Sequence, residues 1–197
     1  IILQQYFDVQ INNGGPATGA KLLINSHLKY KYQFISMDKT FPFHGFNFKQ
    51  FIYFYNEIKT NKPDIVHIRG VQSVGFFGVL AAKLLKRKVV MSIHGLSIDS
   101  EENRGFKRFL YKNIIEKFAL KNADLVYCVC DYACKRNYIR NNTKNLYGFI
   151  HNAAPDFVNV FNENIRKLNR LQYQLSDNDI VVTIISRITR EKGFDVL

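Results

Sequence analysis

A glycine-rich stretch, Asn12–Pro16, separates the first apolar run of the sequence from a segment with helical spacing. Glycines such as Gly14 and Gly15 let backbone N–H groups approach a phosphate closely, and the N-terminus of a following helix adds a favourable dipole. The stretch matches neither GxGxxG nor a Walker loop, so a simple tight turn is an equal alternative. We therefore consider Gly14 and Gly15 candidate phosphate contacts and keep the tight turn as the alternative.

His94 follows the β-branched run Lys88–Ile93 and directly precedes Gly95. If that run is a strand of a parallel sheet, His94 lies at the carboxyl edge, where such sheets bind ligands. A neutral imidazole there can hydrogen-bond to a sugar hydroxyl, and the glycine leaves room for the ligand. The alternative is a loop histidine with a capping role. His67 lies inside an apolar strand pattern instead, so we predict a core histidine with satisfied ring nitrogens.

Arg187 and Lys192 follow the apolar run Ile180–Ile185 and flank the start of a predicted helix. A guanidinium group can hold a diphosphate through two parallel hydrogen bonds, and an ammonium group adds a compact charge. Both would neutralise the charge that builds up on a departing phosphate. The alternative is a basic turn that is simply solvated.

These candidates need a scaffold that brings strand ends together, and the sequence predicts one. Short apolar segments alternate with amphipathic segments of helical spacing. We predict strands at 1–7, 32–37, 64–68, 88–93, 124–129 and 146–150. We predict helices after a cap at Thr18 and at 51–58, 74–85, 106–120 and 132–140. This alternation indicates an α/β fold, a Rossmann-like parallel sheet with helices on both faces and right-handed crossovers.

The sequence changes character at Pro155. We predict a first domain over 1–155, a linker with a polar helix over 156–179, and an incomplete second Rossmann-like domain over 180–197. A strand that begins a new unit and then stops cannot complete a sheet. The alternative is that the apolar run at 180–185 joins the edge of the first sheet.

The composition is that of a globular protein with a basic surplus. Of 197 residues, 28 are basic and 16 acidic, which gives a net charge of +12 and indicates an anionic partner. The candidates are nucleic acid, an acidic membrane surface and a phosphorylated substrate. The basic residues are dispersed and no nucleic-acid-binding motif is present, so we expect no nucleic acid partner, and an acidic membrane surface fits the charge at least as well. No apolar run reaches the length of a transmembrane helix, and no signal peptide pattern is present. We therefore expect a cytoplasmic protein with peripheral contact at the inner membrane face.

Three cysteines lie close together, at Cys128, Cys130 and Cys134. An odd number with this spacing suits reduced thiols in the cytosol. A metal site is the alternative, but C-x-C-x3-C without a fourth ligand nearby lacks the spacing of a zinc site. We expect no metal, and we expect Cys128 to pack inside a strand.

Taken together and in their order, these motifs resemble the retaining GT-B glycosyltransferases of the family 4 type. The resemblance covers nearly the whole chain and rests on the glycine-rich loop, PDIVH before a helix, a strand ending in HG, ADLVYCVC, HNAAPDF and ISRITREKGFDVL. Two segments depart from the family pattern. Ser186 stands where a glycine usually precedes Arg187, and Asn152-Ala153-Ala154-Pro155 departs from the Asn-Gly form of the hinge.

The resemblance implies a hexosyltransferase that moves a sugar from a UDP- or GDP-sugar to an acceptor with retention, in bacterial-type surface polysaccharide or glycolipid synthesis. It implies that Gly14, Gly15, Arg187 and Lys192 contact the donor phosphates and that His94 lies near the reacting carbon of the donor sugar. It also implies that no metal or other cofactor is needed, because the basic side chains stabilise the departing diphosphate.

The acceptor, a sugar or a lipid-linked sugar, would dock on the loops at 69–73 and 97–105. The nucleotide pocket and paired glutamates of the family are not in this sequence, so we predict a fragment that does not catalyse by itself. The alternatives are a non-catalytic α/β binding module, an inactive remnant, or a flavodoxin-like regulatory domain, which would leave Arg187 and Lys192 without a role. A reading frame that continues past Leu197 into a Glu-x7-Glu motif would favour the enzyme.

Overall fold

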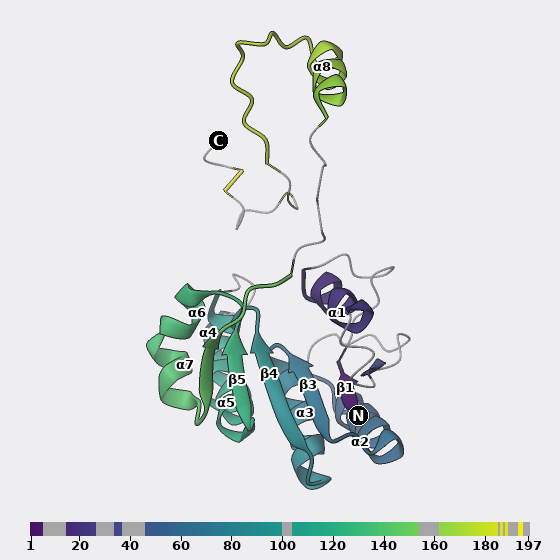
Figure 1. The fold of residues 1–197 in the computed structure, drawn as a ribbon. Helices are drawn as coiled ribbons and strands as arrows, with labels where there is room; N and C mark the ends of the chain where they lie inside the picture. Colours follow the sequence, from purple (N-terminus) through teal and green to yellow (C-terminus); the bar gives the residue numbers. More distant parts are fainter. Residues whose placement is uncertain are drawn as a thin grey trace. The chain divides into compact units, whose positions relative to one another are not determined.

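A computed structural model describes residues 1–5, 15–26, 34–36, 46–99, 104–153, 162–184, 186, 188 and 193–194 (Figure 1). The chain divides into two compact units, Ile1–Pro155 and Asp156–Leu197. This division falls at the proline where the sequence changes character. The assignment of residues 180–197 to the start of a donor-binding domain stays a prediction.

The first unit is built on a parallel sheet. In order across the sheet, the six strands are β2 (Phe34–Ser36), β1 (Ile2–Gln4), β3 (Ile65–Arg69), β4 (Lys88–Ile93), β5 (Leu125–Cys128) and β6 (Leu146–Phe149). Every neighbouring pair is parallel, which confirms the predicted Rossmann-like α/β fold. The chain leaves β1 toward one edge and leaves β3 toward the other. The topological switch point, where such sheets bind ligands, therefore lies between β1 and β3.

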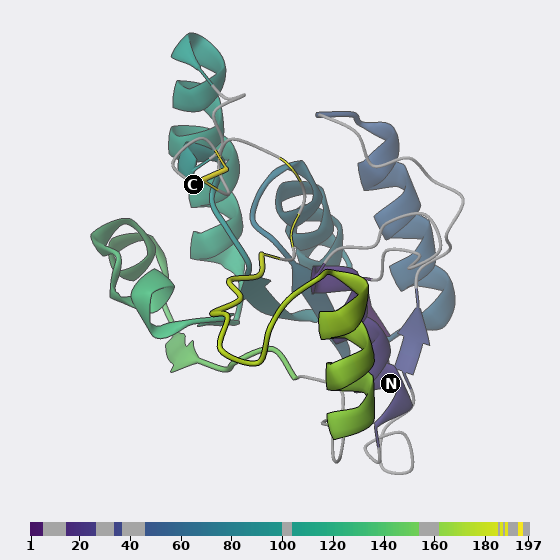
Figure 2. The same ribbon diagram turned by 90° about the horizontal axis from the view of Figure 1, so that it is seen from above.

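Helices connect the strands. They are α1 (Gly15–Asn25), α2 (Lys49–Asn61), α3 (Ser73–Leu84), α4 (Gly105–Leu110), α5 (Lys117–Asn122), α6 (Asp131–Lys135) and α7 (Asn137–Asn142). A short 3-10 helix, η2 (Ser97–Asp99), follows β4, and a π-helical segment, η3 (Tyr111–Glu116), joins α4 to α5 without a break. In Figure 2 the segments α4, η3 and α5 together form the long teal helix. The helix α3 packs against α2, α5 and the sheet.

The core lies between the sheet and the helices α2 and α3. Phe54 of α2 and Ile68 of β3 are fully buried there. A Cβ atom on Gly78 of α3 would come within 2.7 Å of Ile68 Cδ1 and 3.1 Å of Phe54 Cε1, so a larger residue here would require these side chains to shift. The glycine thus allows α3 to pack closely against β3.

Two helix boundaries differ from the sequence predictions. The helix predicted to be capped by Thr18 begins at Gly15, because Pro16 is tolerated in the first turn of a helix, where its missing N–H costs no hydrogen bond. The helix predicted over 132–140 is divided at Arg136, whose backbone is extended. At this break, Nη1 of Arg136 donates to both carboxylate oxygens of Asp99, at 2.8 and 2.7 Å.

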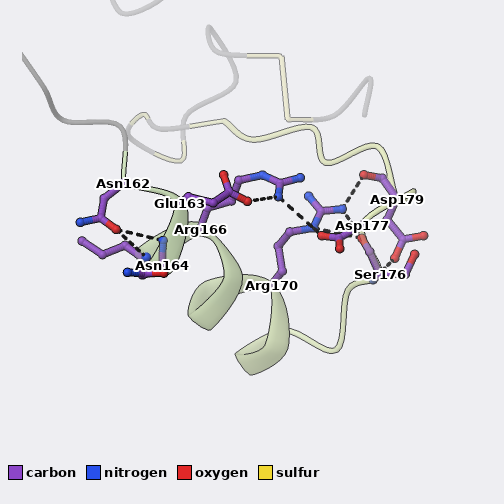
Figure 3. A network of polar contacts seen from close by, with 9 residues as sticks. Asn162, Glu163, Asn164, Arg166, Arg170, Ser176, Asp177 and Asp179 are labelled. Atoms are coloured by element: carbon purple, nitrogen blue, oxygen red, sulfur yellow. Dashed lines mark hydrogen bonds and ion pairs between the residues drawn. The ribbon is translucent and has the colours of Figure 1, made fainter.

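The described part of the second unit contains α8 (Glu163–Gln172) and the polar turn after it (Figure 3). Asn162 caps the helix, with its Oδ1 accepting the N–H groups of Asn164 and Ile165 at 2.9 and 3.2 Å. Arg166 and Arg170 both reach Asp177, at 3.5 and 3.8 Å, and tie the turn to the helix. These contacts are exposed, so each adds little to stability.

The strand predicted at Ile180–Ile185 is not formed over its described residues. Residues 180–184 have no regular secondary structure and are exposed, with Ile180 at 93% and Val182 at 81%. A strand needs a neighbour for its backbone groups and a cover for its apolar face. All six strands of the sheet come from the first unit, so the alternative of an added edge strand is not confirmed. The prediction of a buried strand is wrong for residues 180–184.

Candidate functional site

Polar side chains gather on four neighbouring strands, from the switch point outward, at or near their carboxyl ends. They come from the end of β1, from β3, from the end of β4 and from β5, and they are Gln4, Gln5, His67, Arg69, Ser92, His94 and Tyr127. Five of them, all except His94 and Tyr127, are less than a tenth exposed. Because buried polar groups cost free energy unless they are paired, their hydrogen bonds decide what this edge can do.

His67 is held on both sides of its ring. Its Nδ1 lies 2.6 Å from Oε1 of Gln4, so Nδ1 donates, and its Nε2 accepts from the hydroxyl of Tyr127 at 3.1 Å. Burial, followed by the charge of Arg69, lowers the pKa of His67 from 6.5 to about 3. The imidazole is therefore neutral at pH 7. The prediction of a core histidine with satisfied nitrogens is confirmed.

Arg69 ends β3 at the switch point and is only 8% exposed. Its backbone N–H donates to Oε1 of Gln5 at 2.9 Å, which ties β3 to the end of β1. Its guanidinium group lies against α1 at Gly19, where a Cβ atom would be 3.1 Å from Nη1 of Arg69 and 3.5 Å from Oδ1 of Asn152. Three segments far apart in the sequence thus meet around this cation. Burial lowers the pKa of Arg69, but a guanidinium group stays charged.

His94 lies in the bend directly after β4 and is half-buried. Its Nε2 is 3.2 Å from the hydroxyl of Ser92. Burial, followed by the charge of Arg69, lowers the pKa of His94 to about 4, so this imidazole is also neutral at pH 7. A Cβ atom added to the next residue, Gly95, would meet no atom of the described residues within 4 Å beyond its neighbours in the chain, so there is open space at Gly95. The geometry suits a neutral hydrogen-bonding group for a ligand, while the role of His94 stays a prediction.

The loop after His94 is fixed by a buried carboxylate that the sequence analysis did not single out. Oε1 of Glu116 accepts the backbone N–H of Ser97 at 2.6 Å, and Oδ2 of Asp99 accepts that of Leu96 at 3.2 Å. Glu116 is fully buried, and this burial raises its pKa although the bond from Ser97 opposes the shift. A signal was present in the sequence, because Glu116 stands one helical turn before Leu120 on the apolar face.

Four of the five residues predicted to act at the site were expected on donor phosphates. Gly15 is the first residue of α1. Gly14, Arg187 and Lys192 lie outside the described residues, so whether they approach His94 stays a prediction.

Cys128 is fully buried in β5, as predicted, and burial raises the pKa of its thiol to about 12. Within the described ranges, no group of three histidine, cysteine or acidic side chains could hold a metal ion. The same ranges contain no helix of sufficient length and apolar character to cross a membrane.

Known proteins give a consistent picture of the fold. The model of a family described as glycosyl transferase 4-like matches residues 2–130. No curated protein matches the chain. Among solved structures, the S. aureus MnaA–UDP co-structure is similar, with a TM-score of 0.59 and 13% identity over 88% of this chain and 50% of the MnaA chain. This likeness shows the fold, and the chain spans half the length of MnaA.

Two further solved structures are similar at a lower level. One is a putative UDP-N-acetylglucosamine 2-epimerase from Listeria monocytogenes, with a TM-score of 0.48 and 12% identity over 71% of this chain and 41% of that chain. The other is a UDP-N-acetylglucosamine 2-epimerase with a TM-score of 0.48 and 15% identity, over 74% of this chain and 46% of that chain.

Proposed function

The chain belongs to the glycosyl transferase 4-like family, and on that premise we propose that it carries the acceptor side of an enzyme that transfers a hexose. The donor is a UDP- or GDP-sugar, the acceptor supplies a hydroxyl group, and the configuration at the transferred carbon is retained. The observation that carries the proposal is the arrangement at the carboxyl ends of β3 and β4, where a half-buried, neutral imidazole lies within the field of a buried guanidinium group. Such an edge offers hydrogen bonds to sugar hydroxyls and a positive potential to phosphates.

His94 is the proposed contact to the donor sugar next to the reacting carbon. Its low pKa keeps the ring neutral over the physiological range, so it can donate a hydrogen bond from one nitrogen and accept one at the other. The open space at Gly95 leaves room for the sugar. His67 takes no part in binding, because both of its nitrogens already have partners within the sheet.

The departing diphosphate is the proposed partner of the backbone at Gly14 and Gly15 and of the side chains Arg187 and Lys192. Their positive charge would stabilise the phosphate that leaves the sugar, without a metal ion. Arg69 adds a fixed positive charge at the same edge of the sheet. The field of this charge already reaches His94, whose pKa it lowers.

The acceptor is proposed to dock on the loops that follow β3 and β4, in the synthesis of a surface polysaccharide or glycolipid at the cytoplasmic side of a membrane. The chain spans half the length of MnaA, and we propose that the remaining donor contacts come from sequence beyond it. By itself, the chain is then expected to bind UDP- or GDP-sugars only weakly. Titration calorimetry that shows micromolar binding would contradict this division of the site.

The role of His94 is tested in a protein that continues this chain through a donor-binding domain. Replacement of His94 by alanine should lower kcat about 100- to 1,000-fold, the usual cost of losing one polar contact to the reacting centre. Replacement of the neighbouring Ser92 by alanine is the matched control, because it removes only the partner of the imidazole and should cost far less. A rate unchanged in the His94 variant would return this residue to a structural role in the loop.

A further inference from the structure

The short helix α4 exposes aromatic and basic side chains together. Phe106 is 78% exposed and Phe109 is 59% exposed, and their rings stack with centroids 6.5 Å apart and an interplanar angle of 23°. None of the six residues of α4, all of them described, is buried. We call Phe106, Lys107, Phe109, Lys112 and Ile114 the α4 surface; Ile114, one turn further on, is also more than half exposed.

The only acidic residue of the segment 104–121 is buried, so the charge at its surface is positive. From Arg104 to Lys121 the chain has six basic residues and one acidic residue, Glu116, which is buried. The ammonium groups of Lys107 and Lys112 lie 5.9 Å from the ring centroids of Tyr111 and Tyr138, and both lysines are exposed. Glu101 and Glu102 precede the helix in the sequence and lie outside the described residues.

Two exposed phenylalanine rings on one turn of helix are costly in water. Burying each of them would contribute about 1.5–3 kcal/mol, and clustered exposed apolar groups mark surfaces that meet a partner. Lysines around the rings specify what that partner is. Aromatic rings favour the level of lipid headgroups, and Lys and Arg are drawn to anionic lipids, so this combination is typical of a helix that lies on an acidic membrane.

The α4 surface rests on a firm base close to the candidate site. The helix continues through η3 into α5, where Tyr111, Ile115 and Leu120 are buried. Arg108 donates to the carbonyl oxygen of Ile98 at 3.2 Å, which joins α4 to the loop that follows His94. A flat surface that bound α4 would therefore lie close to the carboxyl ends of the strands.

We propose that the α4 surface binds an anionic lipid bilayer, with Phe106 and Phe109 inserted between the headgroups and Lys107 and Lys112 on the lipid phosphates. This binding stands on the exposed rings and charges alone. A second consequence rests on the proposed function, namely that the acceptor is carried on a lipid and reaches His94 from the bilayer. The two can fail separately, because vesicle binding needs no donor sugar and no catalysis.

The experiment is co-sedimentation of the chain with vesicles of phosphatidylcholine, with and without phosphatidylglycerol. We expect binding to the anionic vesicles that weakens as salt is added. The double variant Phe106→Ser/Phe109→Ser should lower the partition coefficient at least tenfold. The single variant Lys107→Gln should lower it about fivefold, which corresponds to the roughly 1 kcal/mol that a basic residue contributes near such a surface.

Two matched controls separate the α4 surface from general charge and stickiness. Tyr132→Ser removes an aromatic ring that is 76% exposed on α6, and Lys59→Gln removes an ammonium group that lies 6.0 Å from the ring of Tyr55 on α2. Both controls should bind vesicles as the parent chain does. Circular dichroism of all variants establishes that the fold is kept.

Three outcomes would overturn the proposal. The first is equal binding to vesicles with and without phosphatidylglycerol. The second is an equal loss in the Lys59 and Lys107 variants, because net charge alone would then explain the binding. The third is self-association of the chain in the absence of lipid that the Phe106/Phe109 variant abolishes, because a second copy would then cover the α4 surface.

Discussion

Two regions at the carboxyl edge of the sheet hold a neutral histidine in opposite surroundings. Around His67 the ring is buried within the sheet and bonded at both nitrogens, to Gln4 and Tyr127. Around His94 the ring is half-buried after the end of β4, and its nitrogen Nε2 lies near Ser92. The charge of Arg69 lowers the pKa of both.

The comparison shows that a strongly lowered pKa does not by itself identify a functional histidine. Burial is the largest cause in both cases, and it shifts the pKa further at the residue that no ligand can reach. The distinguishing property of the His94 region is the open space at Gly95. If this view is correct, substitutions around His67 should mainly lower the stability of the fold. Substitutions around His94 should lower that stability least.

The largest expected effect is a loss of stability in acid caused by His67. Its pKa is about 3 in the folded state and about 6.5 in the unfolded state, so below pH 6.5 the unfolded chain binds more protons. The stability is therefore complete above pH 6.5 and falls as the pH drops toward 3. One pKa unit corresponds to about 1.4 kcal/mol, so the full loss is roughly 5 kcal/mol. Urea unfolding at a series of pH values from 7 to 4 measures most of it.

The matched control for this prediction is His67→Gln, which keeps a donor for Gln4 and an acceptor for Tyr127 but does not titrate. Its free energy of unfolding should vary about half as much between pH 6.5 and 5, because His94, whose pKa is also lowered, causes a loss in the same direction over this window. This window lies above the range in which carboxylates with lowered pKa, such as Asp124, titrate. An unchanged slope in the glutamine variant would show that another group causes the acid sensitivity.

A smaller loss of stability is expected when Glu116 is substituted. Its carboxylate holds the loop that follows His94. Glu116→Ala leaves the N–H of Ser97 without its acceptor inside the protein and should cost about 2–3 kcal/mol. Glu116→Gln keeps an acceptor oxygen and relieves the burial of a charge, so it should cost less than about 1 kcal/mol. Urea unfolding at pH 7 compares the two. Equal losses would mean that packing, rather than the hydrogen bond, holds the loop.

A still smaller effect links the two regions through Arg69. Arg69→Gln removes the charge that acts on both rings, so the pKa of His94 should rise. It should stay below 6.5, because burial is the larger cause and is unchanged. NMR titration of the imidazole C–H signals follows His67 and His94 in the same sample. A pKa of His94 that does not move would place Arg69 too far away to act on a ligand there.

The fold was predictable where local pattern and packing agree. The strands β3 and β4 are apolar, β-branched runs bounded by breakers such as Pro63 and Gly95. As predicted, His67 lies inside β3 and His94 directly follows β4. The start of α1 was predicted too late, because Gly15 and Pro16 are breakers inside an element but are tolerated in a first helical turn.

The rest depended on segments that meet only in the folded chain. A charged side chain at a strand end is usually solvated, and the burial of Arg69 arises because Gly19 and Asn152 approach it from elsewhere in the sequence. The apolar run at 180–184 has the composition of a strand, but a strand exists only with a neighbour to pair with. No local pattern contains either kind of information.

The smallest effect on stability is expected where the largest effect on function is proposed. His94→Ala removes a half-buried ring next to the open space at Gly95, so little packing is lost. The free energy of unfolding should fall by less than about 1 kcal/mol, as for changes away from a packed core. Urea unfolding at pH 7 of the alanine variants at His94 and His67 measures the contrast directly. Because the buried ring of His67 has two hydrogen-bond partners, its variant should lose at least twice as much. Equal losses would remove the distinction between the two regions.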